Sequence, residues 1–592
     1  MAEQQNSDEL TFVLVPQPGI KRDGTLLEGE NCSDGQWVRF QRGKAKKIGG
    51  YKRVTSGLAG PVRKFILWSR KFINSATSLS MSGIETLLVN NDMVGNAITD
   101  RTPTGFVSDA NNMWTIDTQY DDAVSTTETI FVAHCSQSLT NIDDDTASKP
   151  YWAIASSATS LFVTITDAPA VSGGVFAVPP YTVAYGSDGF VAWSDINQPQ
   201  VWSTSTVPGD AGADRVTGSK IVAGLPMRSG QLAAILWSLD SVIRMDYVGG
   251  QAIWRFSTVS TQSSILASNS VIEYDGTYFW IGVDRFLYFD TSVKELPNDL
   301  NQNWFFDNLN YAHRQKIWAT KVPRFGEIWW FYPRGDATEC SHAVIFNVRL
   351  KTWYDVELAR SAGFYSQVIP FPAWVNSSVE TDTPISNPLQ PWTRVTTTAT
   401  VTRIDHRLVS GDLIHVSETS DAAAVTTGNK TVTVLTADTF SFPCLNSGAV
   451  SGTVTFDSID QTYGLYQHEF GQNAIVGETE LAICSNFTTQ NFGMPTGGIG
   501  DAAQGVSRWT RLTRMEPDFI QVGDMTCYIL GYEYAQSLPE PETSYTFSPT
   551  DGKVDMREQR RHIQLKFESN TLDGFYEAGK VIIHVEPGDN RS

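Results

Sequence analysis

Short runs of aromatic and β-branched residues, separated by polar turns, recur through much of this chain. The stretch from Phe325 to Val356 shows the pattern most clearly. Two apolar runs, Ile328–Tyr332 and Ala343–Asn347, flank a polar turn, and a third run, Thr352–Val356, follows a short basic link. Strand-forming residues bounded by Pro, Gly and Asp predict an antiparallel β-meander. The pattern is typical of a structural scaffold, and it contains no catalytic motif.

Similar pairs of strand-like runs recur at intervals of roughly 42–54 residues, close to the repeat length of four-stranded propeller blades. We therefore predict an all-β protein in which residues 51–386 form a β-propeller of six or seven divergent blades. The repeats carry no WD or kelch signature, so their spacing is the evidence. The runs lie near Glu85–Asn90, Thr129–His134, Thr182–Ala192, Ala234–Tyr247, Thr277–Asp290 and Glu327–Phe346.

Helix signal is scarce along the chain. The best candidate is Asn301–Ala319, where Phe305, Leu309 and Ile317 give an irregular amphipathic pattern. We expect a short helix here that crosses between two blades.

Residues 387–456 differ in composition from the blades. From Thr393 to Phe456 polar and apolar residues alternate strictly, Thr and Val are frequent, and large aromatic residues are few. We predict a small inserted β-domain. The aromatic pattern returns at Thr462–Gly471, so residues 457–477 are expected to re-enter the propeller and close its ring. Closure would remove exposed sheet edges.

We predict a different structure for each end of the chain. Alternating strands with Gly, Asp and Pro turns continue from residue 478 to residue 592 and predict a C-terminal β-sandwich of ordinary size. Residues 1–50 are predicted to form an N-terminal arm with a basic segment. No run approaches the ~18 apolar residues of a membrane span, so none is expected.

Charge is distributed unevenly. The net charge of −20 disfavours a general nucleic-acid binder. Yet Gly35–Ile84 contains eleven Lys and Arg residues and no Asp or Glu, which indicates a local partner or a solvated strand face. We single out its first part as a candidate patch facing an adaptor protein or DNA: Arg39, Arg42, Lys44, Lys46, Lys47, Lys52 and Arg53.

Motifs that carry chemistry are missing from the sequence. The eight His residues show no metal-ligand spacing, and the six Cys residues lie far apart. There is no GxSxG, Walker A or strand-linked GxGxxG motif. We therefore expect no catalytic activity, metal or cofactor. Aromatic residues at blade edges are candidate anchors between subunits, although Trp residues in propellers more often pack between blades: Trp329, Trp353, Trp374 and Trp392.

Several segments occur together and in a recognisable order along the chain: Gly35–Val54, Asp275–Asp290, Arg324–Pro333 with Ala343–Trp353, Gly464–Gly471, Val554–Asn570 and His584–Ser592. In these segments the chain resembles the tail nozzle, tail hub or packaged-DNA-stabilisation proteins of short-tailed bacteriophages. The resemblance depends on the order of the segments and on their presence together.

The resemblance implies a β-propeller protein made in the bacterial host cytoplasm and built into the virion tail as a ring, expected to be a hexamer. Such a ring lies below the portal and adaptor, forms the DNA exit channel, retains the packaged DNA and anchors tail fibres or a needle. An acidic wall would repel phosphate and let DNA slide without sequence-specific binding.

Two other classes remain open from the sequence. A receptor-binding tail fibre or tailspike-like protein would also be β-rich and acidic, but would form elongated trimers and bind glycans. A propeller glycoside hydrolase would need two carboxylates at a fixed separation, which sequence alone does not locate.

Overall fold

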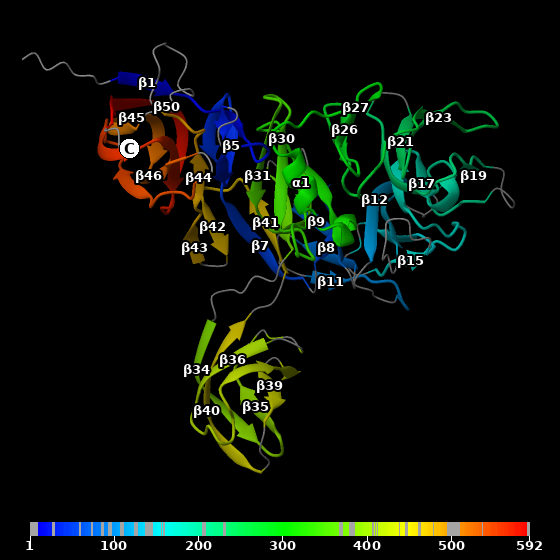
Figure 1. Cartoon of the computed structure of the whole chain (residues 1–592). Helices are drawn as coiled ribbons and strands as arrows, with labels where there is room; N and C mark the ends of the chain where they lie inside the picture. Colours follow the sequence, from blue (N-terminus) through cyan, green and yellow to red (C-terminus); the bar gives the residue numbers. More distant parts are fainter. Residues whose placement is uncertain are drawn as a thin grey trace, which may run out of the picture.

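The computed structural model is almost entirely β (Figure 1). It describes residues 10–588 except for a number of short segments. These are residues 26–29, 59–60, 73–74, 85–87, 93–97, 107–111, 123–127, 137–145, 156, 158–159, 204–208, 229–231, 366–370, 378–384, 405, 407, 409, 411–412, 437, 445–447, 460–462, 477–478, 494–508 and 535–536.

Within the described residues, seven sheets follow one another as the blades of a propeller, and the first six are antiparallel throughout. The first six each contain four consecutive strands. Their bounds are β8(Val62–Phe72), β9(Ser75–Ile84), β10(Leu88–Asp92) and β11(Ile98–Asp100); β12(Met113–Asp121), β13(Glu128–Ser136), β14(Tyr151–Ile154) and β15(Val163–Thr164); β16(Gly174–Val178), β17(Tyr181–Tyr185), β18(Phe190–Trp193) and β19(Gly212–Arg215); β20(Ile221–Pro226), β21(Ala233–Ser238), β22(Val242–Tyr247) and β23(Trp254–Ser260); β24(Ile272–Tyr274), β25(Thr277–Ile281), β26(Phe286–Phe289) and β27(Val293–Glu295); β28(Trp318–Val322), β29(Glu327–Tyr332), β30(His342–Asn347) and β31(Thr352–Glu357).

The seventh blade closes the ring with strands from distant parts of the chain. Its order is β32(Arg360–Phe364), β33(Ala373–Asn376), β41(Tyr463–His468) and β7(Tyr51–Leu58), extended by β42(Asn473–Val476) and β43(Thr479–Ala482). Thus the strand that follows the insert pairs with a strand from before the first blade. Strand β32 also lies against β8 of the first blade, so the ring is complete and the expected β-propeller is present.

The blades are held together by side chains packed between neighbouring sheets. All six residues of β29 are buried, because both faces of this strand meet apolar neighbours. One face joins a cluster with the fifth blade, around Phe286 and Trp353, and the other faces Trp374 in the seventh blade. Burial on both faces explains the continuous aromatic run at this strand in place of an alternating pattern.

The predicted helix lies where the chain crosses from the fifth to the sixth blade. It is shorter than expected: α1(Gln302–Asn308) is followed by a 3₁₀ segment, η2(Tyr311–Lys316), before β28 begins. The Asp23 carboxylate accepts hydrogen bonds from the backbone N–H groups of Asn303 and Trp304, each at 2.8 Å, and so satisfies the open start of the helix. A second short 3₁₀ turn, η1(Ser187–Gly189), precedes β18.

The insert leaves the propeller between β33 and β41 and forms its own domain, drawn apart from the rest in Figure 1. Its apolar core consists wholly of residues from within the domain, including Trp392, Phe440 and Phe456. Its strands are β34(Ile385–Arg394), β35(Thr398–Thr402), β36(Leu413–Thr419), β37(Gly428–Thr431), β38(Thr433–Thr436), β39(Thr439–Pro443) and β40(Val450–Ile459).

The C-terminal region forms a two-sheet sandwich that also includes the start of the chain. One sheet runs β48-β45-β50-β6-β5, with β1 also paired to β50, and the other runs β4-β44-β49-β46-β47. The bounds are β1(Leu10–Leu14), β4(Asp34–Gln36), β5(Val38–Gln41), β6(Lys44–Lys47), β44(Ser485–Thr488), β45(Thr510–Val522), β46(Met525–Tyr532), β47(Thr543–Phe547), β48(Val554–Arg560), β49(His562–Ser569) and β50(Phe575–Pro587).

The expectation of a separate N-terminal arm over residues 1–50 is therefore wrong for the described strands of that segment. Four of them complete the sandwich, and a parallel pair, β2(Gln17–Ile20) and β3(Asn31–Cys32), lies between it and β31 of the sixth blade. The physical reason is that these short N-terminal strands are unstable alone, whereas the C-terminal sheets offer edges that they can pair with.

Candidate functional site

A hairpin made of β5 and β6 carries most of the predicted basic patch. Gln41 pairs with Lys44 across a two-residue turn formed by Arg42 and Gly43. Both turn residues have positive φ, 54° and 80°, which suits the right-handed twist of the flanking strands. The hairpin lies at the edge of the sandwich sheet, next to β50.

The structure divides the seven basic residues of this patch into three groups by exposure. Arg42, Lys44 and Lys52 are exposed, and Lys46 and Arg53 are half-buried. Arg39 and Lys47 are each only 1% exposed, so the hypothesis that they face an adaptor or DNA is wrong for this conformation. Arg39 pairs with Lys46 and Lys47 pairs with Val38, so the two residues lie on opposite faces of the hairpin. Both are buried because this part of the hairpin is covered on both faces.

Arg39 forms the centre of a buried ion cluster with Glu327 and Glu469. Its guanidinium nitrogens lie 2.9 Å from Glu327 Oε1 and 2.5 Å from Glu469 Oε1. These residues come from the sandwich hairpin, from β29, and from the turn after β41. A Cβ atom at Gly49 would lie 2.6 Å from Glu469 Oε2, so glycine at that position allows the close approach. We call this cluster, with the apolar core around it, the sandwich–propeller joint.

The charges in the joint depend on one another. Burial alone would lower the pKa of Arg39, but the carboxylates of Glu327 and Glu469 outweigh it and raise that pKa above its ordinary value. Burial raises the pKa of Glu327, and the Arg39 charge only partly offsets this effect. Glu327 also accepts hydrogen bonds from Tyr354 Oη at 2.7 Å and from Trp329 Nε1 at 2.9 Å. Removing Arg39 would leave a buried carboxylate without a counterion.

A second ion cluster fixes the N-terminal segment to the sixth blade. Arg22 donates to both carboxylate oxygens of Asp355 at 3.1 Å and also pairs with Asp34. Close by, Gln36 and Glu357 exchange hydrogen bonds between the Gln36 side chain and the Glu357 backbone, at 3.1 and 3.0 Å. The N-terminal segment is thus bonded to the same blade that supplies Glu327.

The apolar core is continuous across the joint. A single cluster of buried residues joins Leu512, Met515 and Ile583 of the sandwich to Trp329 and Tyr354 of the sixth blade. Burial of this kind stabilises the contact in proportion to the apolar area removed from water. The sandwich and the sixth blade therefore share one core.

The four tryptophans predicted as subunit anchors are all buried, which corrects that expectation. Trp329 and Trp374 pack on each other in the joint, with ring centroids 5.1 Å apart, and Trp353 lies 4.6 Å from Phe286 between two blades. Trp392 lies in the core of the insert. The reason is that most of these side chains fall on strands with two buried faces, so no blade edge exposes them.

Sequence reasoning missed the acidic partners in the joint. Glu327 opens an otherwise apolar run, GEIWWFY, and Glu469 follows the closing strand. A charged residue inside a strand that is expected to be buried requires a buried partner of opposite charge. That signal could have marked Glu327, although it could not have identified Arg39 as the partner.

Lys47 is a further buried cation beside the joint. It lies on β6, and no hydrogen-bond partner of its Nζ is found among the described residues. Burial lowers the pKa of Lys47 to about 8, and the nearby Cys484 and Asp573 oppose the shift. Its pKa thus lies closer to neutrality than that of an exposed lysine.

The part of the chain that the structure describes contains neither a metal centre nor a membrane-spanning helix. No set of three or more His, Cys, Asp or Glu side chains there could hold a metal ion. None of the helices found there has the length and apolar character needed to cross a membrane.

Comparison with known proteins gives distant structural likenesses. No family model and no curated protein sequence matches the chain. Similar solved structures include a puromycin-hydrolysing peptidase from Mycobacterium tuberculosis, at 12% identity and a TM-score of 0.32, over 61% of this chain and 60% of that one. BamB from Moraxella catarrhalis matches at 10% identity and a TM-score of 0.26, over 70% of this chain and 99% of that one.

A third structure, an exo-β-1,3-galactanase from Phanerochaete chrysosporium, matches at 9% identity and a TM-score of 0.24, over 91% of this chain and all of that one. The chain spans 60% of the length of the mycobacterial peptidase. At these identities and TM-scores, the likenesses carry no information about the chemistry of this chain.

Proposed function

We propose that this chain is a non-catalytic virion protein, a subunit of the ring-shaped tail nozzle or hub of a short-tailed bacteriophage. In this proposal the ring lies below the portal and adaptor, forms the DNA exit channel, retains packaged DNA and anchors fibres or a needle. The observation that carries it is the convergence of three phage-like segments on one joint: Gly35–Val54 contributes Arg39, Arg324–Pro333 contributes Glu327, and Gly464–Gly471 contributes Glu469.

A ring subunit that retains packaged DNA needs domains that do not move against each other. The buried ion cluster and the shared core supply that rigidity between sandwich and propeller, because separating them would expose apolar surface and unpair buried charges. The insert, with its own core, is suited to a peripheral docking role.

The DNA path in such a ring would run between subunits and not through a propeller. The cavity at the centre of the propeller has a volume of about 360 Å³, which is the size of a small-molecule pocket. Repetition of a subunit with a net charge of −20 around a ring would surround the DNA with net negative charge, which repels phosphate.

The exposed cations of the β5–β6 hairpin are the part of the basic patch available to an adaptor. Arg42 and Lys44 lie at its tip, and Lys44 is 3.5 Å from Glu577. Exposed charges of this kind affect association rate and orientation more than stability of the subunit. Attachment to the acidic underside of an adaptor would use these two residues.

Electron microscopy of negatively stained particles tests the ring proposal. The purified chain would be imaged alone and after mixing with portal–adaptor complexes of a short-tailed phage. Closed rings that cap the adaptor are the expected result and would also show the number of subunits. Elongated trimers that ignore the adaptor and bind glycans would contradict it and favour a receptor-binding protein.

Charge reversal tests the attachment surface. The double variant Arg42→Glu, Lys44→Glu should reduce adaptor attachment at least several-fold at ordinary salt, with unchanged folding. The matched control is Lys553→Glu, Arg557→Glu, which makes the same charge change beside and on β48, at the opposite edge of the same sheet. Equal attachment of both variants and the parent protein would exclude the hairpin as the docking surface.

A further inference from the structure

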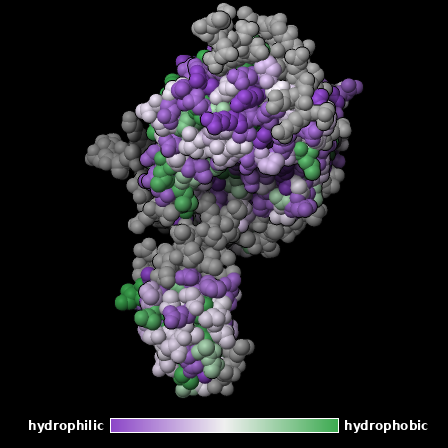
Figure 2. Space-filling view, turned by 60° about the vertical axis from the view of Figure 1, so that its left-hand side comes forward, coloured by the Kyte–Doolittle hydropathy of each residue, from purple (hydrophilic) through white to green (hydrophobic). Residues whose placement is uncertain are grey.

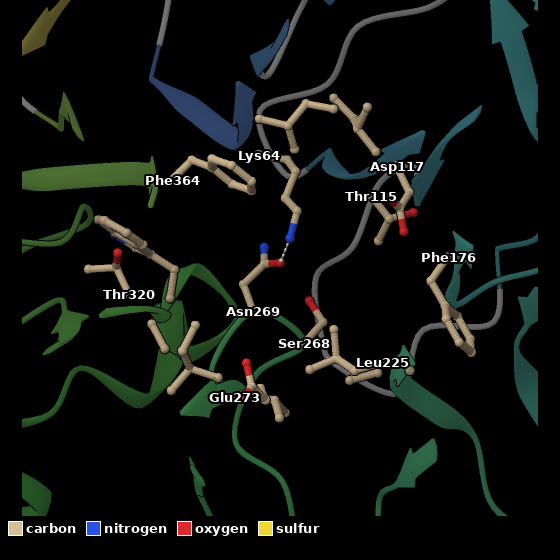
Figure 3. A pocket seen from close by; sticks show the side chains of 18 of the residues that line it. Lys64, Thr115, Asp117, Phe176, Leu225, Ser268, Asn269, Glu273, Thr320 and Phe364 are labelled. Atoms are coloured by element: carbon tan, nitrogen blue, oxygen red, sulfur yellow. Dashed lines mark hydrogen bonds between the residues drawn. The ribbon is translucent and has the colours of Figure 1, made fainter. Parts of the chain in front are cut away.

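The central cavity of the propeller is lined by residues from all seven inner strands (Figure 3). Its volume of about 360 Å³ is far larger than the space needed for one water molecule and lies in the range of small-molecule pockets. The charged and other polar side chains around it include residues of β8, β12, β24 and β28 and of the loops after β20 and before β24.

The charges around this cavity differ in sign from those of the whole chain. Its charged lining residues are Arg63, Lys64, Arg228 and Lys321 against Asp117 and Glu273, whereas the chain carries a net charge of −20. Low-dielectric walls focus the field of such a cluster. The cavity is therefore a locally cationic site that favours an anion.

Most of these charges already have partners. Arg63 pairs with Glu339 at 2.6 Å, and Lys321 pairs with Glu273 at 2.9 Å. Glu273 also has Arg228 within 3.6 Å. Although burial acts to raise the pKa of Glu273, its hydrogen bonds and these cations hold the pKa below its ordinary value. Glu273 is therefore ionised and neutralised.

Lys64 and Asp117 form no ion pair within the described part of the chain, and Lys64 is the cation of the two. Its Nζ reaches into the cavity and donates one long hydrogen bond, 3.4 Å, to Asn269 Oδ1 (Figure 3). No carboxylate within the described part of the chain lies close enough to form an ion pair with it. Burial lowers the pKa of Lys64, and the more distant Asp117 only partly opposes the shift. An ammonium group held in this way lacks a close anion.

Groups that bind hydroxyls surround the same space. Asp117 Oδ2 accepts the backbone N–H of Ala177 at 2.9 Å and keeps further acceptor capacity. Asn269 donates to the Arg63 carbonyl at 3.3 Å, which orients its amide oxygen toward Lys64. Ser268 and Thr320 add hydroxyl groups (Figure 3).

Apolar walls complete the cavity. Phe176 and Phe364 lie on different sides of it in Figure 3. Glycine is required beside one of these rings, because a Cβ atom at Gly224 would lie 2.4 Å from the Phe176 ring. Aromatic faces next to convergent polar groups are typical of sites for small organic ligands.

We propose that this cavity binds a small hydroxylated carboxylic acid, of the sugar-acid type. Its carboxylate pairs with the Lys64 ammonium, its hydroxyl groups donate to Asp117, and its apolar face packs on an aromatic wall. The site is separate from the joint and from the β5–β6 hairpin, and it does not depend on the ring proposal.

Calorimetric titration of the full-length protein with D-glucuronate and D-glucose tests this site. The two probes share a ring and differ in one carboxylate, so the comparison isolates the contact with Lys64. We expect glucuronate to bind at least about tenfold more tightly than glucose, the usual effect of a bond to a charged group. Absence of saturable glucuronate binding, or equal binding of both probes, would overturn the proposal.

A Lys64→Met variant provides the second measurement. It should lose the preference for glucuronate, while the control Lys294→Met, at an exposed lysine on the outer strand β27, should keep it. Melting temperatures establish that both variants are folded. A preference that survives in folded Lys64→Met would also overturn the assignment. If that variant does not fold, the probe comparison on the parent protein decides.

Discussion

The terminal sandwich and the insert are both small β-domains, but they are connected to the propeller in different ways. The sandwich shares an apolar cluster with the sixth and seventh blades and contributes Arg39 to a buried ion cluster. The insert has its own core and emerges between two strands of the seventh blade. Figure 2 shows hydrophobic side chains on its surface, and Leu389 and Ile404 are exposed there.

This difference in connection predicts that the two β-domains differ in how their unfolding is coupled to the propeller. Where cores are continuous, one domain cannot unfold without exposing the other, so sandwich and propeller should behave as one cooperative unit. Where a domain has a complete core, its stability is local. The seventh blade does not depend on the insert, because β33 pairs directly with β41 and Asn376 Oδ1 accepts the Gly464 N–H at 2.6 Å.

The largest expected effect is at the ion cluster of the joint. Arg39→Met leaves Glu327 buried without its counterion and should lower the free energy of unfolding by about 3–5 kcal/mol. Urea denaturation followed by fluorescence measures this change. Arg215→Met, at an exposed ion pair with Asp188, is the matched control and should have little effect. Equal effects of the two substitutions would contradict the role of the joint.

A pair of tryptophan substitutions compares the two regions directly. Trp374→Ala and Trp392→Ala each remove a fully buried side chain and should cost about 3–5 kcal/mol. The first should destabilise sandwich and propeller together, whereas the second should unfold the insert alone. Hydrogen exchange monitored by mass spectrometry locates the affected segments. Loss of protection in the propeller of Trp392→Ala would show that the insert is coupled after all.

Acid should destabilise the propeller through buried histidine. Burial lowers the pKa of His134 to about 4, against about 6.5 in the unfolded chain. Because the folded state resists protonation, stability is full above pH 6.5 and falls as the pH drops toward 4, by about 3 kcal/mol for this group. His134→Gln should flatten that part of the stability–pH profile. An unchanged profile would exclude His134 as its source.

The smallest effect is expected from removing the insert. Replacing residues 379–461 by a four-residue turn should change the main melting temperature by no more than about 2–4 °C, equivalent to about 1 kcal/mol. Residues 385–459 produced alone should show their own cooperative transition. Calorimetry measures both. A large fall in the melting temperature of the shortened chain would contradict independent folding of the insert.

Local pattern predicted much of the fold. Alternation and turn residues indicate the strands, the blade-length repeat indicates a propeller, and the Thr- and Val-rich composition marks the insert. The helix near Asn301 was also located, although it is shorter than expected. The N-terminal strands were not assigned to the sandwich, because nothing in residues 1–50 indicates which distant sheet they complete.

The candidate site was predicted less well than the fold. The basic block is real as a sequence feature, but Arg39 and Lys47 point inward and the four tryptophans are core residues. A charged or aromatic residue on a short strand has the same local pattern whether its face meets solvent or another blade. Burial on both faces removes the alternation of polar and apolar residues that would otherwise show which side chains face solvent.

The sequence by itself determined which segments become strands, where the repeats lie and where the insert begins. The reason is that the periodicity of apolar side chains and the chemistry of turn residues are local properties. Only the tertiary structure decided how the ring closes and what holds the sandwich to it. Arg39 and Glu469 are separated by 430 residues, and their pairing depends on three chain segments meeting in a space that excludes water. Such a contact has no local signature.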